Sequence, residues 1–163
     1  MSKRFWMGVV YVAVIGALSN VVALFIRRDK LQEKSFPFRS YAWEKNGKVY
    51  DHLAIRKWKN KVPDVSRVLK LLLPKKVASG TRSEDLKKLI KETCVAEIIH
   101  CGLIVCSIVV LWIAPGKEGL LLFGLCLLGN LPFIMIQRYN RPQLILAAER
   151  LARREERLRQ CES

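Results

Sequence analysis

Residues 98–136 read IIHCGLIVCSIVVLWIAPGKEGLLLFGLCLLGNLPFIMI, and the order of apolar and polar residues here predicts the architecture. It holds two apolar runs, Ile98–Ala114 and Gly119–Ile136, separated only by Pro115–Glu118. A helix needs about 20 apolar residues, within a range of ~17–25, to cross a bilayer core of ~30 Å. Both runs reach that range. We therefore predict two transmembrane helices that lie side by side and antiparallel, because the turn between them is short.

A third apolar run, Phe5–Ile26, contains no charged residue. The apolar core of a signal peptide is only ~7–15 residues long and ends at a small-residue cleavage site. This run is longer and ends at Arg27 and Arg28, which is typical of a retained membrane helix. The sequence therefore predicts an all-α membrane protein, with residues 1–163 in one membrane domain. The predicted transmembrane helices cover about residues 5–26, 96–114 and 119–137.

The segment 27–93 is predicted to be interfacial, because aromatic residues are scattered there among Lys and Arg. Asn46-Gly47 is typical of a tight turn, in either a hairpin or a helix-turn. A short amphipathic run, Val65–Leu73, follows and ends at Pro74.

Ser83 is a candidate N-cap, because Glu84 and Asp85 follow it in the first turn. We predict one uninterrupted helix from about Ser83 to Ala114. Proline predicts a kink at Pro132 in the third membrane helix and a break at Pro142. A separate helix is predicted from Gln143 to Cys161, within the basic tail 138–163.

The positive charges predict the orientation. Lys and Arg number 2 before the first run, 19 between the first and second, 1 in the short turn and 7 after the third. Positive residues stay on the cytoplasmic side of a membrane. The N-terminus is therefore expected outside, and the segment 27–93 and the C-terminus in the cytoplasm. The net charge of +15 is explained by this topology and by attraction to anionic lipid headgroups. No nucleic-acid-binding motif accompanies the charge, so we predict no nucleic-acid partner.

The five cysteines form no Cys-x-x-Cys pair, so neither a metal nor a disulfide framework is predicted. Four of them lie in or beside the predicted membrane helices, where cysteine behaves as a small apolar residue. They are Cys94, Cys101, Cys106 and Cys126; Cys161 lies in the tail.

Three polar residues share one face where the second membrane run begins. Glu97 and His100 are spaced i, i+3, and Thr93 lies four residues before Glu97. Ionisable groups at membrane depth are costly and usually functional. A carboxylate beside an imidazole orients the ring for general-base work on a hydroxyl. The alternatives are an interfacial ion pair and half of a carboxylate di-metal site. The latter needs a second Glu-x-x-His pair, which the chain lacks, so no metal is predicted.

The motif Gln137–Pro142, QRYNRP, ends the third membrane run. Counting outward from the short turn places Phe133 level with His100, and Arg138 about 7.5 Å nearer the cytoplasm at ~1.5 Å per residue. The two polar clusters are therefore predicted to meet at one membrane face. Arginine suits bidentate capture of phosphate or carboxylate, although positive-inside anchoring explains Arg138 equally well.

Four cations surround Trp58 in Ile55–Lys61. They could bind lipid headgroups or a phosphorylated donor, or they could form an ordinary interfacial patch. His52 has no partner nearby in the sequence and is read as a surface residue.

These motifs resemble one family. The sequence RKWK at 56–59 with Asp64, the pairs Glu92-Thr93 and Ala96-Glu97 with His100, and QRYNRP occur in this order, at similar spacing, in the glycosyl-4,4'-diaponeurosporenoate acyltransferases of Gram-positive bacteria. The resemblance runs from about Trp43 to Arg141.

The resemblance implies an enzyme of the bacterial cell membrane that esterifies a sugar hydroxyl of a glycosylated carotenoid with a fatty acyl chain, the last step of staphyloxanthin synthesis. It implies a cytoplasmic acyl donor, acyl-CoA or acyl carrier protein, and no further cofactor. It leaves open whether the acceptor is a glycocarotenoid or another glycolipid.

Acyl transfer to an alcohol needs a base and groups that stabilise an oxyanion. We assign His100 as the base and Glu97 as the residue that orients it. The residues predicted to bind substrate are Arg56, Lys57, Trp58, Lys59, Thr93, Arg138, Tyr139, Asn140 and Arg141. Two other functions are compatible with the sequence: a non-catalytic membrane scaffold with a lipid-binding basic face, and a membrane transferase or reductase that uses a nucleotide-bearing donor. A second copy of the chain could complete the site.

Overall fold

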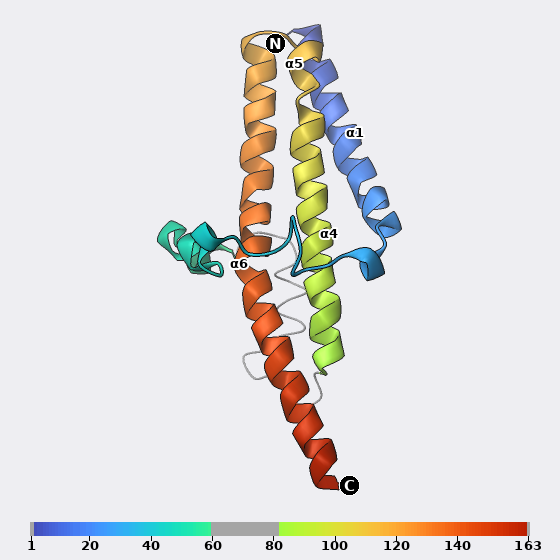
Figure 1. The fold of residues 1–163 in the computed structure, drawn as a ribbon. Helices are drawn as coiled ribbons and strands as arrows, with labels where there is room; N and C mark the ends of the chain where they lie inside the picture. Colours follow the sequence, from blue (N-terminus) through green and yellow to red (C-terminus); the bar gives the residue numbers. More distant parts are fainter. Residues whose placement is uncertain (1, 60–81, 163) are drawn as a thin grey trace. The chain divides into compact units, whose positions relative to one another are not determined.

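The computed structural model describes residues 2–59 and 82–162, and the regular elements among these residues are all helices, with no strand (Figure 1). Three stretches are long and apolar enough to cross a membrane: Lys3–Phe25, Ser83–Ile113 and Lys117–Cys161. The predicted all-α architecture with three membrane helices is therefore confirmed. The elements are α1 (Lys3–Phe25), η1 (Arg28–Lys30), η2 (Ala42–Glu44), η3 (Lys48–Leu53), α2 (Ile55–Trp58), α4 (Ser83–Ser107), α5 (Val110–Ile113) and α6 (Lys117–Glu162).

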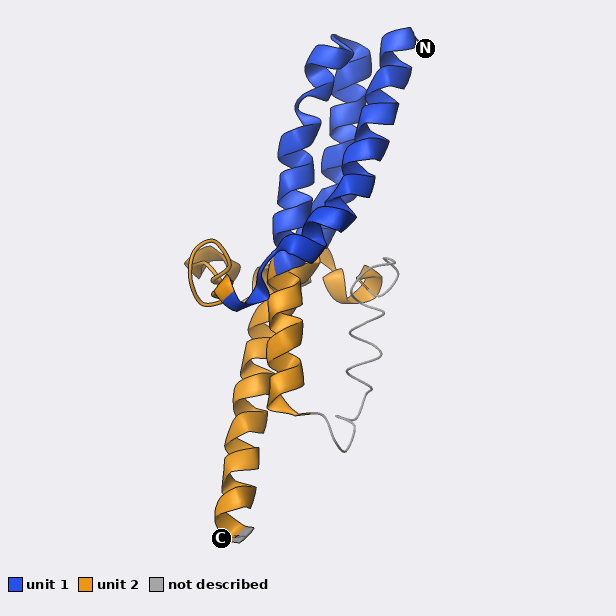
Figure 2. Cartoon of the chain, turned by 90° about the vertical axis from the view of Figure 1, so that its right-hand side faces the viewer, with its two compact units in different colours: residues 1–29, 95–135 blue, residues 30–94, 136–163 orange. Residues whose placement is uncertain are grey.

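The chain divides into two compact units, coloured separately in Figure 2. The first unit contains residues 1–29 and 95–135, and the second contains residues 30–94 and 136–163. The predicted amphipathic run Val65–Leu73 and the motif residue Asp64 lie outside the described residues.

In the first unit, α1 is apolar on almost its whole surface and buries only Phe5 and Gly8. Such a helix is suited to lipid on most sides. Its buried end packs through Phe5 against Val110 of α5 and Leu122 of α6. Gly8 allows the close approach, because a Cβ there would lie 2.7 Å from the Leu122 Cδ1 atom. Small residues at contacts between membrane helices serve this purpose.

The prediction of one uninterrupted helix to Ala114 is wrong. The α-helix α4 ends at Ser107, and α5 begins at Val110. Between them the backbone hydrogen bonds shorten from i→i−4 to i→i−3, as in Ile108 N–H to Val105 O at 3.2 Å. This tighter winding falls on a run of β-branched residues, whose side chains crowd an α-helix.

The predicted break at Pro142 is also wrong, since α6 continues from Lys117 to Glu162 through both of its prolines. Proline removes one backbone hydrogen bond from a helix. Beyond Pro142, however, Leu144 and Ala148 are buried against a cluster of apolar residues on α4. This packing offsets the local cost and keeps the tail helical. The α4 residues of the cluster are Leu86, Leu89 and Ile90.

In the second unit the segment after α1 is tied to both long helices. Lys91 of α4 forms an ion pair with Glu33 at 2.5 Å, and Lys34 forms one with Glu149 of α6 at 2.7 Å. The predicted Asn-Gly turn is confirmed, and it joins two 3₁₀ helices rather than two strands. At its centre, Gly47 has a φ of 86°.

Candidate active site

In the first unit, His100 of α4 lies against α6. The His100 Nδ1 atom is 2.8 Å from the Asn130 Oδ1 atom. The imidazole also stacks on Phe133, with ring centroids 4.5 Å apart and planes at 4°. These contacts confirm that the two helices are neighbours in this unit and that His100 is level with Phe133.

The hydrogen bonds of Asn130 determine the tautomer of a neutral His100. The Asn130 Nδ2 group donates to the Cys126 carbonyl at 2.8 Å, so Oδ1 is the atom that faces the imidazole. An amide oxygen only accepts, and the His100 Nδ1 atom must therefore carry the proton. The acceptor lone pair of the neutral ring is then on Nε2, which is the arrangement that a general base requires.

Sequence reasoning missed Asn130 as a partner of His100. The sequence did hold a sign of this contact. Asn130 is a polar residue inside the apolar run Gly119–Ile136, and it lies within one helical turn of the level of His100. Glu97 lies on α4 in the same unit and is buried, with 6% of its surface exposed. Its assignment as the residue that orients His100 stays a prediction.

A groove lies between α1 and α4, and two of its lining residues, Ile99 and Leu103, are within one helical turn of His100 in the sequence. It has a volume of about 300 Å³ and an almost wholly apolar lining. Gly102 opens onto it, since a Cβ placed there would meet no atom within 4 Å. The groove is lined by Ile15, Leu18, Ser19, Val22, Ile98, Ile99, Gly102, Leu103 and Cys106.

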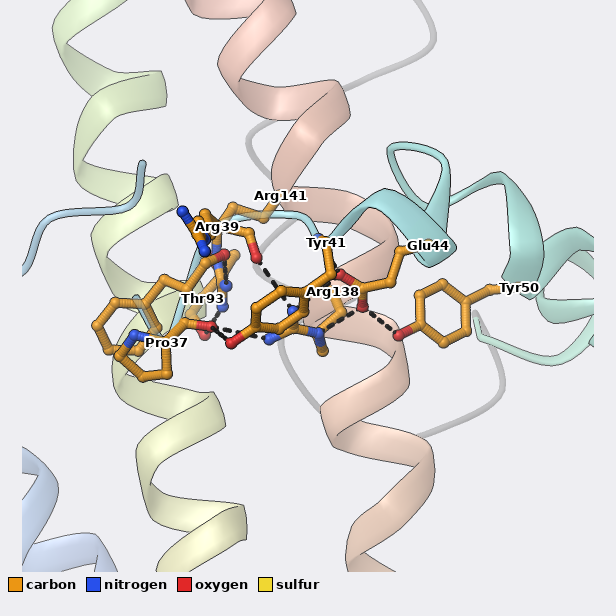
Figure 3. A network of polar contacts seen from close by, with 9 residues as sticks. Pro37, Arg39, Tyr41, Glu44, Tyr50, Thr93, Arg138 and Arg141 are labelled. Carbon is orange, nitrogen blue, oxygen red and sulfur yellow. Dashed lines mark hydrogen bonds and ion pairs between the residues drawn. The ribbon is translucent and has the colours of Figure 1, made fainter. Parts of the chain in front are cut away.

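In the second unit, Arg138 of α6 is the centre of a polar network (Figure 3). Its Nε and Nη2 groups donate to the two carboxylate oxygens of Glu44, at 2.5 and 2.8 Å. Tyr50 donates its hydroxyl to the same carboxylate at 2.6 Å. The guanidinium also lies over the ring of Tyr41, 4.8 Å from its centroid. Such a bidentate, stacked geometry is specific to arginine.

The network perturbs two ionisable groups. Burial by itself raises the pKa of Glu44, but hydrogen bonds from Arg138 and Tyr50 outweigh burial and leave this pKa below its usual value. Burial, together with the adjacent carboxylate of Glu44, raises the pKa of Tyr50. Glu44 is therefore charged, and Tyr50 neutral, at neutral pH.

Arg141 and Thr93, both predicted to bind substrate, contact each other. Arg141 is 1% exposed and donates to the Thr93 hydroxyl at 2.9 Å and to the Thr93 carbonyl at 3.0 Å. It also donates to the Phe38 carbonyl at 2.8 Å. Arg141 thus fastens the segment around Phe38 to α4 and α6, and its role toward a substrate stays a prediction.

The structure also brings the basic segment at 56–59 to the QRYNRP motif. Arg56 donates to the Tyr139 hydroxyl at 2.9 Å, and Lys59 donates to the Asn140 Oδ1 atom at 2.9 Å. Lys59 also lies over the Tyr139 ring, 4.5 Å from its centroid. Burial, and then the charge of Arg56, lower the pKa of Lys59.

The remaining residues predicted in the basic segment differ in exposure. Lys57 is exposed, and Trp58 is partly buried and donates its indole N–H to the Leu53 carbonyl at 2.9 Å. His100 and Glu97 belong to the first unit, whereas the arginine motifs belong to the second. The predicted meeting of the two clusters at one membrane face therefore stays a prediction.

Further arginines gather on the part of α6 that follows the motif, where they surround a shallow pocket of about 310 Å³. Positive charge on this surface suits anionic headgroups or a phosphorylated molecule. The arginines are Arg150, Arg153, Arg154 and Arg157.

Among residues 2–59 and 82–162, no three His, Cys, Asp or Glu side chains are grouped so as to hold a metal ion.

Comparison with known proteins identifies the family. The sequence profile described as glycosyl-4,4'-diaponeurosporenoate acyltransferase matches residues 34–150. A protein of that name from Staphylococcus aureus (strain bovine RF122 / ET3-1) is 30% identical over 127 residues, which are 77% of this chain and 76% of the relative. Its counterpart in strain USA300 is 29% identical over the same length. No solved structure matches. These relatives favour an enzyme over a non-catalytic scaffold, and the chain belongs to the glycosyl-4,4'-diaponeurosporenoate acyltransferase family and is an acyltransferase.

Proposed function

We propose that this protein transfers a fatty acyl group from acyl-CoA or acyl carrier protein to a sugar hydroxyl of a glycosylated lipid. The name of the relatives specifies a glycosylated carotenoid, and we propose an acceptor of the same class. The observation that carries the chemistry is the His100–Asn130 hydrogen bond, because it leaves Nε2 as the basic nitrogen of an imidazole held between membrane helices.

In the proposed reaction, His100 Nε2 accepts the proton of the sugar hydroxyl as the oxygen attacks the thioester carbonyl of the donor. The new C–O bond forms, the C–S bond breaks, and the imidazolium returns its proton to the departing thiolate. Glu97 is proposed to stabilise the imidazolium. Groups of the QRYNRP motif are proposed to stabilise the oxyanion or hold the donor.

The groove between α1 and α4 is proposed to hold the hydrocarbon part of a substrate. Its apolar lining fits a hydrocarbon chain, and its residues Ile99 and Leu103 lie within one helical turn of His100. A chain lying in this groove would bring its polar end to the level of the imidazole.

We further propose that the protein lies in the bacterial cell membrane with its N-terminus outside and its C-terminus in the cytoplasm. This orientation follows the distribution of Lys and Arg. The arginines that end α6 would then face anionic headgroups and the cytoplasmic acyl donor.

The experiment is mass spectrometry of lipids and pigments from cells that express the wild type or His100→Ala at matched levels, with glycosylated acceptors supplied. We expect an acylated glycolipid with the wild type and a loss of about 10²–10⁴-fold in the variant, the usual contribution of a general base. Undiminished product in His100→Ala would remove His100 from the mechanism. If the wild type made no product from any supplied acceptor, the proposed reaction itself would fail.

A further inference from the structure

Gln137 is the first residue of the QRYNRP motif, and both polar atoms of its buried side chain lack a hydrogen-bond partner among the described residues. Its side chain is 1% exposed. Among the residues that the structure describes, neither its Nε2 nor its Oε1 atom has a hydrogen-bond partner. Most buried polar side-chain atoms in native proteins are hydrogen-bonded, so a buried amide with both ends unmet requires an explanation.

The neighbours of Gln137 in the motif each form a side-chain hydrogen bond within the protein. Arg138 binds Glu44, the Tyr139 hydroxyl accepts from Arg56, and the Asn140 oxygen accepts from Lys59. Arg141 lies four residues after Gln137, on the same face of α6, and binds Thr93 of α4. Gln137 thus occupies the packed side of the helix, where an apolar side chain of the same volume would be more stable.

We propose that Gln137 is a substrate-binding residue and that its carboxamide recognises the sugar of the acceptor. This inference rests on the proposed function, because it identifies which part of the acceptor the site binds. The Nε2 group donates to a sugar oxygen, and Oε1 accepts from a sugar hydroxyl.

The chemistry of the amide fits a sugar better than it fits the phosphates or the hydrocarbon chains of the substrates. A carboxamide has both donors and an acceptor, and sugar hydroxyls both donate and accept. A phosphate of the acyl donor, when fully ionised, has acceptors only and would leave Oε1 unmet. A hydrocarbon chain would leave both ends unmet. Because Gln137 is buried, the sugar replaces protein atoms that now cover it, and binding involves a local rearrangement.

The test compares Gln137→Met, which keeps the approximate volume and removes the hydrogen-bonding groups, with Gln143→Met as a matched control. Gln143 is exposed on the same helix and donates to the Tyr139 carbonyl at 3.0 Å. Both variants and the wild type are purified in a detergent without a sugar headgroup. Melting temperatures and steady-state kinetics with a glycosylated lipid acceptor are then measured.

We expect Gln137→Met to melt no lower than the wild type, and its KM for the acceptor to rise about 10-fold or more, as for a site that loses a hydrogen bond to a substrate hydroxyl. The KM for the acyl donor and the kinetics of Gln143→Met should not change. Wild-type acceptor kinetics in Gln137→Met would overturn the proposal. A large fall in its melting temperature would also overturn it, because the amide would then be bonded within the folded protein.

A binding measurement separates this inference from the proposed reaction. An alkyl glucoside should raise the melting temperature of the wild type and of Gln143→Met but not of Gln137→Met, while the alcohol of the same chain length should act equally on all three. This result would support the sugar site even if acyl transfer were never detected. An equal effect of the glucoside on all three proteins would refute the sugar site, whatever the reaction.

Discussion

A neutral amide orients the histidine proposed as the base. An amide that is bonded at both ends carries little penalty when it is buried between membrane helices. Asn130 meets this condition, since its nitrogen donates to the Cys126 carbonyl and its oxygen faces His100. The same residue therefore stabilises one tautomer and satisfies its own hydrogen bonds.

Replacing Asn130 by alanine should lower kcat by about 10- to 100-fold, the loss seen when a group that orients a metal-bound histidine is removed. The imidazole would lose the acceptor that holds the proton on Nδ1. The check is steady-state acyl transfer by the purified protein. Asn20→Ala is the control, because Asn20 is exposed on α1 and donates only to a carbonyl of its own helix, that of Gly16. Equal losses in the two variants would contradict a specific role for Asn130.

Glu44 and Arg138 illustrate a residue-scale interaction that holds a loop. Replacing Glu44 by glutamine removes the negative charge from a buried ion pair with Arg138. Arg138 still donates hydrogen bonds to the carbonyl groups of Pro37 and Arg39. We expect a destabilisation of about 3 kcal/mol, at the low end for breaking a buried ion pair. Hydrogen exchange of the backbone amides in residues 38–53 measures this destabilisation. Glu149→Gln, which breaks an exposed pair with Lys34, should destabilise the protein much less than Glu44→Gln.

The same pair predicts a pH dependence. The pKa of Glu44 in the folded protein lies below its unfolded value of about 4.3. The stabilisation is therefore complete above the unfolded pKa and is lost as the pH falls through the folded one. Melting temperatures from pH 7 to pH 3 should fall more steeply for the wild type than for Glu44→Gln. Parallel curves would show that Glu44 is not coupled to folding.

At the scale of elements, a glycine allows the turn between η2 and η3 to approach α6. A Cβ at Gly47 would lie 3.0 Å from the Tyr139 carbonyl oxygen, and φ at this position is 86°. Two effects therefore favour glycine at position 47, the positive φ and the close approach to α6. A second glycine in the chain allows the two effects to be measured separately. Gly116 has a φ of 87° but open space around its Cβ position.

Gly116→Ala should cost about 1–2 kcal/mol, the penalty for a side chain in the left-handed region. Gly47→Ala should cost more, because the added methyl group must also push the turn away from Tyr139. Thermal denaturation in detergent compares the two, and proteolysis within residues 37–53 should accelerate only in Gly47→Ala. Equal costs and equal cleavage would mean that the close approach is not required.

The α1–α4 groove gives a second test at this scale. Gly102→Leu places a side chain in the groove without a steric clash at Cβ and favours the helix. If the groove holds substrate hydrocarbon, kcat/KM should fall about 10-fold or more, as for a hydrophobic pocket altered by a few methylenes. Gly124→Leu is the control, since Gly124 of α6 also faces open space and does not line the groove. Unchanged kinetics in Gly102→Leu would exclude the groove as a substrate site.

For the whole molecule, the distribution of charge predicts one orientation in the membrane. In a background with the other cysteines replaced, Cys161 should react with an impermeant maleimide only after the cells are opened. A cysteine introduced as Lys117→Cys, in the turn before α6, should react in intact cells. The reverse pattern would invert the proposed topology, and with it the side from which the acyl donor arrives.

The membrane helices, and the register of two of them, follow from the amino-acid sequence alone. A long apolar run in lipid must form a helix, because only a helix satisfies its backbone hydrogen bonds within the segment. The short turn then fixes the register, since His100 and Phe133 are equally far from it along the two helices. The helix interruption after Ser107 and the continuation through Pro142 were not predictable in this way. Local preferences are weak, and packing of residues such as Leu144 overrides them.

Which polar groups contact one another depends on the tertiary structure. Asn130 is 30 residues from His100 and Glu44 is 94 residues from Arg138, so no local pattern links them. Nor does a sequence distinguish an arginine that binds the protein's own carboxylate and carbonyl groups from one that awaits a ligand. The unmet hydrogen bonds of Gln137 were equally invisible, because burial and the absence of a partner among the described residues are properties of packing.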